Sequence, residues 1–119
     1  MNYKNLEIWR LVNELVVDIH EMTINKLPKF EMFEEGSQIR RSSKSVGANI
    51  VEGFGRKKYK AAYVQFLTFA LASCDETKYH LEMLHETNSL SEESFKYFME
   101  GYNELGRKIF NFRKSVISG

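Results

Sequence analysis

The sequence predicts an all-α protein, built as an up-down-up-down antiparallel four-helix bundle. Apolar residues recur at spacings of three and four in four blocks, and glycine, proline and polar clusters fall between the blocks. Strand signals are nearly absent. With 119 residues and 43% hydrophobic content, the chain is large enough for one domain, residues 1–119, with its own core. The short connections require consecutive helices to run antiparallel.

The first block predicts a helix over residues 6–25, because charged side chains occupy the face opposite an apolar stripe. Pro28 ends this pattern, since it lacks an amide hydrogen and disfavours helical angles at Leu27. A turn is expected over residues 28–30. The stripe consists of Ile8, Trp9, Val12, Leu15, Val16, Ile19 and Met22.

The second block predicts a helix over residues 36–54, with small residues between its apolar positions where another helix can approach. We expect Gly53 or Gly55 to close this helix in the left-handed conformation. The cations that follow suit the negative end of the helix dipole. The apolar positions are Ile39, Val46, Ile50 and Phe54.

The third block predicts a helix over residues 60–86 that is apolar over most of its circumference. In its segment AAYVQFLTFALASC, eleven of fourteen residues are apolar and none is charged. Each helix of a monomeric bundle keeps one solvent-exposed face. The wide apolar surface of this helix therefore predicts that it is buried against a neighbouring subunit as well as against the core. The expected oligomer interface is Tyr63, Leu67, Leu71 and Cys74.

The fourth block predicts a helix over residues 92–116. Ser91 is a good N-cap, and Glu92 and Glu93 follow it near the positive end of the helix dipole. The apolar stripe is rich in aromatic residues: Phe95, Phe98, Tyr102, Leu105, Ile109, Phe112 and Val116. Basic residues fill the last turns: Arg107, Lys108, Arg113 and Lys114.

Charge is unevenly distributed, although the whole chain is close to neutral at +1. Residues 38–60 hold seven cations and one acid, a net +6, whereas residues 75–104 hold eight acids and two lysines, a net −6. Clustered cations attract nucleic-acid phosphates, with salt-sensitive and largely sequence-blind binding. Tyr59 and Tyr63 are interleaved with them and can stack on bases, although packing is favoured for Tyr63. The expected nucleic-acid-binding residues are Arg40, Arg41, Lys44, Arg56, Lys57, Lys58 and Lys60.

A polar stripe also runs along the second helix. Three explanations stay open: a solvated face, a hydrogen-bond ladder between helices or subunits, and a ligand site. Glu52 and Arg56 are spaced to form an ion pair. The stripe consists of Gln38, Arg41, Ser45, Asn49, Glu52 and Arg56.

Residue patterns for catalysis are weak. A Glu-x-x-His pair of the di-iron type occurs once, at Glu82 and His85, where two are needed, so no metal is expected. Cys74 lies in an apolar run and is expected to be packed and unreactive. His80 lies one helical turn after Glu76, within reach of a surface hydrogen bond. We therefore expect no enzymatic activity and no cofactor.

No uncharged apolar run reaches the roughly 20 residues that span a bilayer, and the start of the sequence lacks the pattern of a secretory signal. One cysteine cannot form an internal disulfide, which agrees with a reducing compartment. We expect a soluble, cytoplasmic protein with no membrane association.

The run QIRRSSKSVGANIVEGFGR resembles the signature of the 23S rRNA intervening sequence protein family, also called four-helix bundle proteins. LEIWRLVNELV and YVQFLTFALASCDET resemble the family's first and third helices, so the resemblance covers nearly the whole chain. The chain departs at Ser42, Leu71 and Cys74, where alanine, glycine and leucine are usual. Residues that match the signature are Gln38, Arg40, Arg41, Ser45, Val46, Asn49, Ile50, Glu52, Gly53, Gly55 and Arg56.

The resemblance implies a small bacterial protein, often encoded within an insertion in the large-subunit rRNA gene, that assembles into a ring-like homopentamer without catalytic activity. Related proteins serve as accessory variability determinants of diversity-generating retroelements. These accessory proteins are thought to bind nucleic acid and a reverse transcriptase. The expected function is a non-enzymatic oligomer that binds RNA or DNA. The alternatives are a protein-interaction scaffold and an accessory subunit of such a reverse transcriptase.

Overall fold

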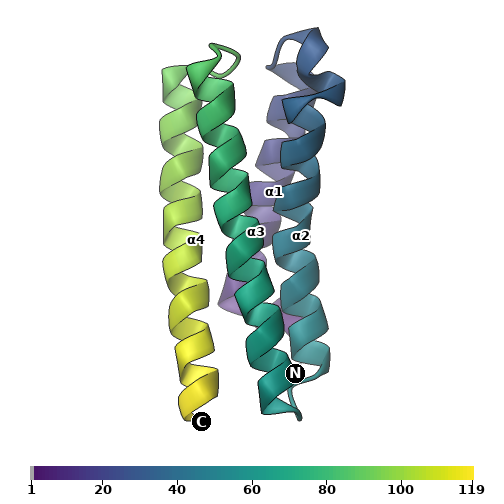
Figure 1. The fold of residues 1–119 in the computed structure, drawn as a ribbon, viewed down its shortest axis with the longest axis vertical. Helices are drawn as coiled ribbons and strands as arrows, with labels where there is room; N and C mark the ends of the chain where they lie inside the picture. The colour runs from purple at the N-terminus through teal and green to yellow at the C-terminus, as the bar shows by residue number, and fades with distance from the viewer. Residues whose placement is uncertain (1) are drawn as a thin grey trace.

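The structure, a computed structural model, describes residues 2–119 and contains four long helices and two short 3-10 helices (Figure 1). The long helices begin and end within two residues of their expected bounds. The described residues form no strand, so the prediction of an all-helical protein with four helices is confirmed. In chain order the elements are η1 (Tyr3–Asn5), α1 (Glu7–Asn25), η2 (Lys29–Phe33), α2 (Glu35–Gly55), α3 (Lys60–Glu86) and α4 (Glu92–Ser118).

The four long helices alternate in direction and form a rod of about 45 × 20 × 20 Å (Figure 1). Both α1 and α3 pack on α2 and α4, so α1 and α3 lie on one diagonal of the bundle. η2 and the α3–α4 turn lie at one end of the rod, and the α2–α3 turn lies at the other with the last turn of α4. No helix in residues 2–119 combines the length and apolar character that a membrane crossing needs.

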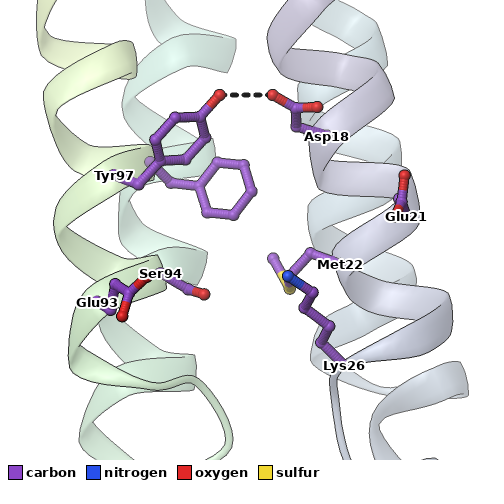
Figure 2. Close-up of a pocket in the computed structure, with 8 residues that line it drawn as sticks. Asp18, Glu21, Met22, Lys26, Glu93, Ser94 and Tyr97 are labelled. Carbon is purple, nitrogen blue, oxygen red and sulfur yellow. Dashed lines mark hydrogen bonds between the residues drawn. The ribbon is translucent and has the colours of Figure 1, made fainter.

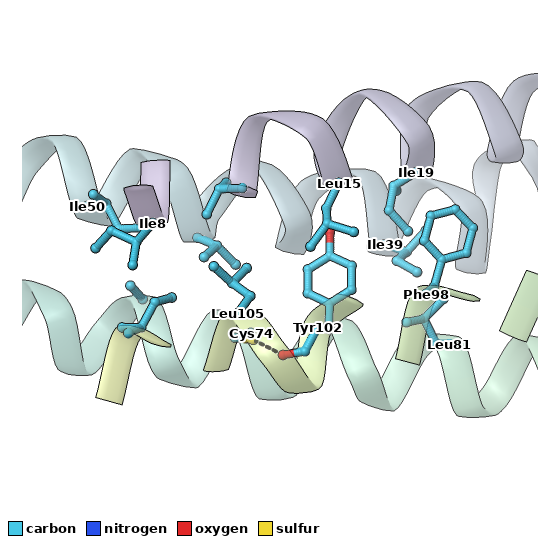
Figure 3. Packing of buried hydrophobic residues seen from close by; sticks show 14 of the residues in the cluster. Ile8, Leu15, Ile19, Ile39, Ile50, Cys74, Leu81, Phe98, Tyr102 and Leu105 are labelled. Atoms are coloured by element: carbon cyan, nitrogen blue, oxygen red, sulfur yellow. Dashed lines mark hydrogen bonds between the residues drawn. The ribbon is translucent and has the colours of Figure 1, made fainter. Parts of the chain in front are cut away.

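The core runs along the whole rod because each helix contributes an apolar stripe at helical spacing. Figure 3 shows side chains from all four helices meeting between the ribbons. Burial of such side chains contributes roughly 1.5–3 kcal/mol each to folding. The labelled core residues are Ile8, Leu15, Ile19, Ile39, Ile50, Cys74, Leu81, Phe98, Tyr102 and Leu105.

The helices α2 and α3 approach closely because small side chains lie between them. A Cβ added at Gly53 would stand 3.0 Å from the Cβ of Phe66. Hydroxyl pairs also cross this interface, with 2.9 Å between the oxygens of Ser42 and Thr77. These short polar groups satisfy one another, so the two backbones approach without leaving a buried hydroxyl unpaired.

The helix ends agree only partly with expectation. The Ser91 hydroxyl accepts a hydrogen bond from the backbone N–H of Ser94 at 3.1 Å, which confirms the predicted N-cap. The left-handed closure at Gly53 or Gly55 is wrong, since no described glycine has a positive φ. Instead, the backbone N–H of Arg56 bonds to the Gly53 carbonyl at 2.9 Å, and the chain leaves α2 through a right-handed turn.

The corner between α1 and α2 contains η2, where only a turn was expected. Glu31 is buried there, and its carboxylate accepts a hydrogen bond of 2.6 Å from the Ser89 hydroxyl in the α3–α4 turn. The Arg40 guanidinium donates to the Thr23 hydroxyl at 2.9 Å and to the Met32 carbonyl at 2.5 Å. Arg40 therefore fastens the corner to α1.

The apolar width of α3 is largely explained within one chain. Leu67 and Cys74 are fully buried in the bundle's own core, and Tyr63 is 7% exposed. The assignment of these side chains to an oligomer interface is therefore wrong, because they have no free surface to offer another copy. Leu71 is partly buried and also packs against the core.

Candidate nucleic-acid interface

The α2–α3 turn presents consecutive basic residues to solvent. Arg56, Lys57, Lys58 and Tyr59 are all exposed. Backbone hydrogen bonds hold the turn in shape: the Tyr59 N–H donates to the Arg56 carbonyl at 2.8 Å, and the Tyr63 N–H donates to the Tyr59 carbonyl at 3.0 Å. The side chains of the turn therefore project from an ordered backbone.

Two other segments bring cations to the same end of the rod. The Lys60 ammonium donates to the carbonyl oxygens of Ile117 and Gly119 at 3.0 and 2.8 Å, which ties the start of α3 to the end of α4. Lys108 forms an ion pair of 3.2 Å with Glu7 at the start of α1. We call this surface the basic end. Its cations are Lys4, Arg10, Arg56, Lys57, Lys58, Lys60, Arg107, Lys108, Arg113 and Lys114.

Dividing each helix at its middle separates the charge of the rod into two halves of opposite sign. Residues 2–15, 46–72 and 106–119 hold ten cations and three acids, a net +7. Residues 16–45 and 73–105 hold seven cations and thirteen acids, a net −6. The nearly neutral chain therefore folds into a rod with a basic half and an acidic half, and a polyanion is drawn to the first.

The cations of the α2–α3 turn differ in how free they are. Arg56 pairs with the Glu52 carboxylate at 2.5 Å, and its guanidinium carbon lies 4.8 Å from the centre of the Phe66 ring. The Lys57 ammonium lies 4.2 Å from the centre of the Phe54 ring. In residues 2–119, neither Lys57 nor Lys58 forms an ion pair with a carboxylate. These two lysines keep their full charge available.

Three of the predicted nucleic-acid-binding residues do not lie at the basic end. Arg40 is engaged at the η2 corner, and Arg41 forms an ion pair with Glu76 on α3. Lys44 is exposed near the middle of α2, separated from Arg56 by twelve helical residues or about 18 Å. A helix of this length spreads the seven predicted cations along the rod, so these three stand apart from the basic end, and nucleic-acid binding by the seven stays a prediction.

Two residues of the polar stripe, Arg41 and Ser45, form hydrogen bonds from α2 to α3 within one chain, and the hydrogen bonds of the others stay within α2 and its C-cap. The hydroxyl oxygens of Ser45 and Ser73 lie 2.8 Å apart, and the Asn49 amide donates to the Ser45 carbonyl at 2.9 Å. Gln38 accepts a weak bond of 3.4 Å from Arg41, and Glu52 pairs with Arg56 as its spacing predicts. Of the three explanations, the interhelical ladder accounts for Ser45.

Sequence reasoning missed a network around His80. The ring nitrogens of His80 lie 2.6 Å from the Glu35 carboxylate and 3.0 Å from the Glu76 carboxylate. Glu76 also binds Arg41, and the hydrogen bond from His80, followed by the charge of Arg41, lowers the pKa of Glu76. The pair Glu76–His80 was visible at helical spacing, but Glu35 is 45 residues distant and only the fold brings it there.

The other chemically notable residues have structural partners. Cys74 is fully buried, which confirms that it is packed, and burial raises the pKa of its thiol to about 11. His85 lies 2.5 Å from the Glu92 carboxylate and stacks on Phe95 with ring centres 4.1 Å apart. Across residues 2–119, no three His, Cys, Asp or Glu side chains gather as a metal site.

A groove of about 310 Å³ lies between α1 and α4 in the acidic half (Figure 2). Across it the Tyr97 hydroxyl donates to the Asp18 carboxylate at 2.6 Å, and this bond raises the pKa of Tyr97. With three acids and one lysine, the groove repels phosphate. Its lining residues are Asp18, Glu21, Met22, Lys26, Glu93, Ser94, Tyr97 and Phe98.

Comparisons with known proteins give one matching family model and a similar solved structure. The family model described as 23S rRNA-intervening sequence protein matches residues 4–111. A crystal structure of a protein of unknown function from the S23 ribosomal protein family of Bacteroides thetaiotaomicron is similar, with a TM-score of 0.79 and 26% sequence identity. The similarity covers 90% of this chain and 95% of that one. No curated protein matches the chain.

Proposed function

Because the chain belongs to the 23S rRNA-intervening sequence protein family, we propose that it is a non-enzymatic, self-associating bundle that binds RNA through the basic end. The observation behind this proposal is the convergence of cations from three segments on one end of the rod, within a half that carries +7. It acts in the bacterial cytoplasm, where RNA is available. A ring-like pentamer would repeat the basic end once per subunit.

The mechanism of binding is electrostatic. Lysine and arginine side chains neutralise backbone phosphates and release condensed counterions, so affinity falls as salt rises. Phosphate contacts of this kind fix the position of the nucleic acid without reading its sequence. Lys57 and Lys58 are central, because both are exposed and neither is paired with an internal carboxylate in residues 2–119.

A charge-reversal experiment tests this proposal. The double variant Lys57→Glu, Lys58→Glu is compared with the matched variant Lys26→Glu, Lys29→Glu, which changes two exposed lysines at the opposite end. Fluorescence anisotropy with labelled RNA gives the affinity at 50 and 200 mM salt. For each phosphate contact that the protein makes, its affinity for a duplex is expected to fall about 3.5-fold as salt rises from 50 to 200 mM.

We expect the first variant to lose at least about 10-fold in affinity and to show a shallower salt dependence, while the matched variant stays close to the parent. Both variants carry the same net charge, so equal losses would point to a non-specific charge effect. Equal binding by parent and Lys57→Glu, Lys58→Glu protein contradicts the proposal. Melting temperatures establish that both variants are folded.

A second candidate function is a protein-interaction scaffold, or an accessory subunit of a retroelement reverse transcriptase. The observation that favours it is the opposite end of the rod, where Phe33 is 88% exposed beside acidic residues of the η2 corner. An exposed aromatic ring is a common anchor in protein interfaces. This hypothesis predicts that partner binding is weakened by two variants at this end, the double variant Lys26→Glu, Lys29→Glu and the single variant Phe33→Ala. Neither variant is expected to change the affinity for RNA.

A further inference from the structure

An exposed aromatic ring lies within the basic turn. Tyr59 is 71% exposed, although it directly follows Lys58 and precedes the first residue of α3. Tyr63, the other tyrosine near these lysines, is buried and packs edge-on against Phe112 with ring centres 5.9 Å apart. Of these two tyrosines, Tyr59 is the one whose ring remains available to a ligand at this turn.

The position of Tyr59 is fixed, whereas its ring is free. Its backbone N–H and carbonyl both take part in hydrogen bonds within the turn and the start of α3, at 2.8 and 3.0 Å. No ring-to-ring contact involving Tyr59 occurs in residues 2–119. A flat ring held on an ordered backbone loses little freedom when a ligand stacks on it.

Charge and aromaticity together narrow the class of ligand. Phosphates of any nucleic acid satisfy Lys57 and Lys58, but a base can stack on a tyrosine only when its face is free. Bases in a continuous duplex are already stacked on their neighbours. A basic turn that also holds an exposed aromatic ring is therefore suited to unpaired nucleotides.

We propose that Tyr59 is a base-stacking residue and that the basic end selects unpaired RNA, such as loops and single strands, over continuous duplex. This inference rests on the proposed function, because stacking requires phosphates to be held beside the ring. It adds the structural class of the RNA, which charge alone does not specify. Tyr59 is a specificity-determining residue and makes no phosphate contact in this arrangement.

The test measures the affinity for two labelled ligands, a 20-nucleotide unpaired RNA and a duplex with the same number of phosphates. The proteins compared are the parent and the variants Tyr59→Ala, Tyr59→Phe and Phe33→Ala. Tyr59→Ala is expected to weaken unpaired binding on the order of 10-fold and to leave duplex binding and the salt slope unchanged. Tyr59→Phe retains the ring and keeps the preference. Phe33→Ala removes an exposed ring at the other end and changes neither affinity.

Three results overturn the inference. Equal parent affinity for unpaired and duplex RNA, unaffected by Tyr59→Ala, overturns it while the proposed function stands. Failure of the parent to bind either RNA at low salt overturns both. If Tyr59→Ala weakens both ligands equally and changes the oligomer size in light scattering, the ring packs against another copy of the chain and the base-stacking role is overturned.

Discussion

Tyr102 lies at the centre of the core with a hydroxyl oxygen that has no hydrogen-bond partner in residues 2–119 (Figure 3). Burial is the main reason that the pKa of this hydroxyl is raised. A buried polar group without a partner costs roughly 1–3 kcal/mol of stability. The ring itself fills space beside Leu15 in the core.

Replacing Tyr102 with phenylalanine is expected to increase the free energy of unfolding by about 1 kcal/mol, because the ring stays and the unpaired hydroxyl is removed. Urea unfolding followed by circular dichroism measures the change. Tyr102→Leu is the control, and it should destabilise because it removes ring volume. A clear loss of stability in Tyr102→Phe would mean that the hydroxyl has a partner in solution.

At the scale of elements, the α2–α3 pair combines close packing with a polar network. Gly53 allows the backbones to approach, and the hydroxyl ladder satisfies the groups that they enclose. Next to the ladder, His80 connects Glu35 on α2 with Glu76 on α3. A network of this kind fixes the register of two helices in a way that apolar packing alone does not.

The lowered pKa of Glu76 makes part of the bundle's stability depend on pH. The unfolded state takes up a proton at higher pH than the folded state does, so this stabilisation is full above the ordinary glutamate pKa of about 4.3. It is lost as pH falls through the lower folded-state value. Glu76 is partly exposed, so the effect is small.

Chemical unfolding at pH 6 and pH 3 checks this dependence. The parent is expected to lose more stability on acidification than Glu76→Gln, which has no proton to bind and still reaches His80. Glu82→Gln is a matched control on the exposed side of the same helix and should behave like the parent. Identical pH dependence in the parent and in Glu76→Gln would contradict the network's contribution.

At the scale of the whole molecule, the rod carries opposite charge on its two halves and keeps aromatic rings on its outside. Phe69 and Tyr79 on α3 are 44% and 55% exposed, although Leu67 and Cys74 on the same helix are buried. Exposed rings on a helix that already fills the core are candidates for contact between copies. The proposed self-association therefore moves from the buried face of α3 to its outer face.

Phe69→Ser is expected to reduce the molar mass measured by multi-angle light scattering at micromolar concentration, because it removes apolar contact area from the outer face of α3. Phe110→Ser is the matched control, since Phe110 on α4 is exposed to a similar degree. A parent protein that runs as a monomer would end the proposal of self-association. Equal masses for parent and Phe69→Ser would place the interface elsewhere.

Local sequence patterns predicted the helices well and the site only in part. Helical spacing and a serine N-cap depend on neighbours within one turn, so α4 could be placed from Ser91 and its stripe alone. Arg40 looked like its neighbour Arg41 in the sequence, yet it binds Thr23 and Met32 at a corner that no local pattern describes. The contacts that such a side chain makes depend on residues that are distant in the sequence.

The amino-acid sequence by itself determined four amphipathic helices and their short antiparallel connections, because helical spacing, capping and punctuation are local properties. The family followed separately, from the resemblance of QIRRSSKSVGANIVEGFGR to the family signature. Only the tertiary structure decided which charges act together. It joined the end of α4 to Lys60 and the start of α1 to Lys108, at the same end of the rod as Lys57 and Lys58, and it buried Tyr63 while leaving Tyr59 exposed. Surface potential and exposure depend on distances in space, and folding sets those distances.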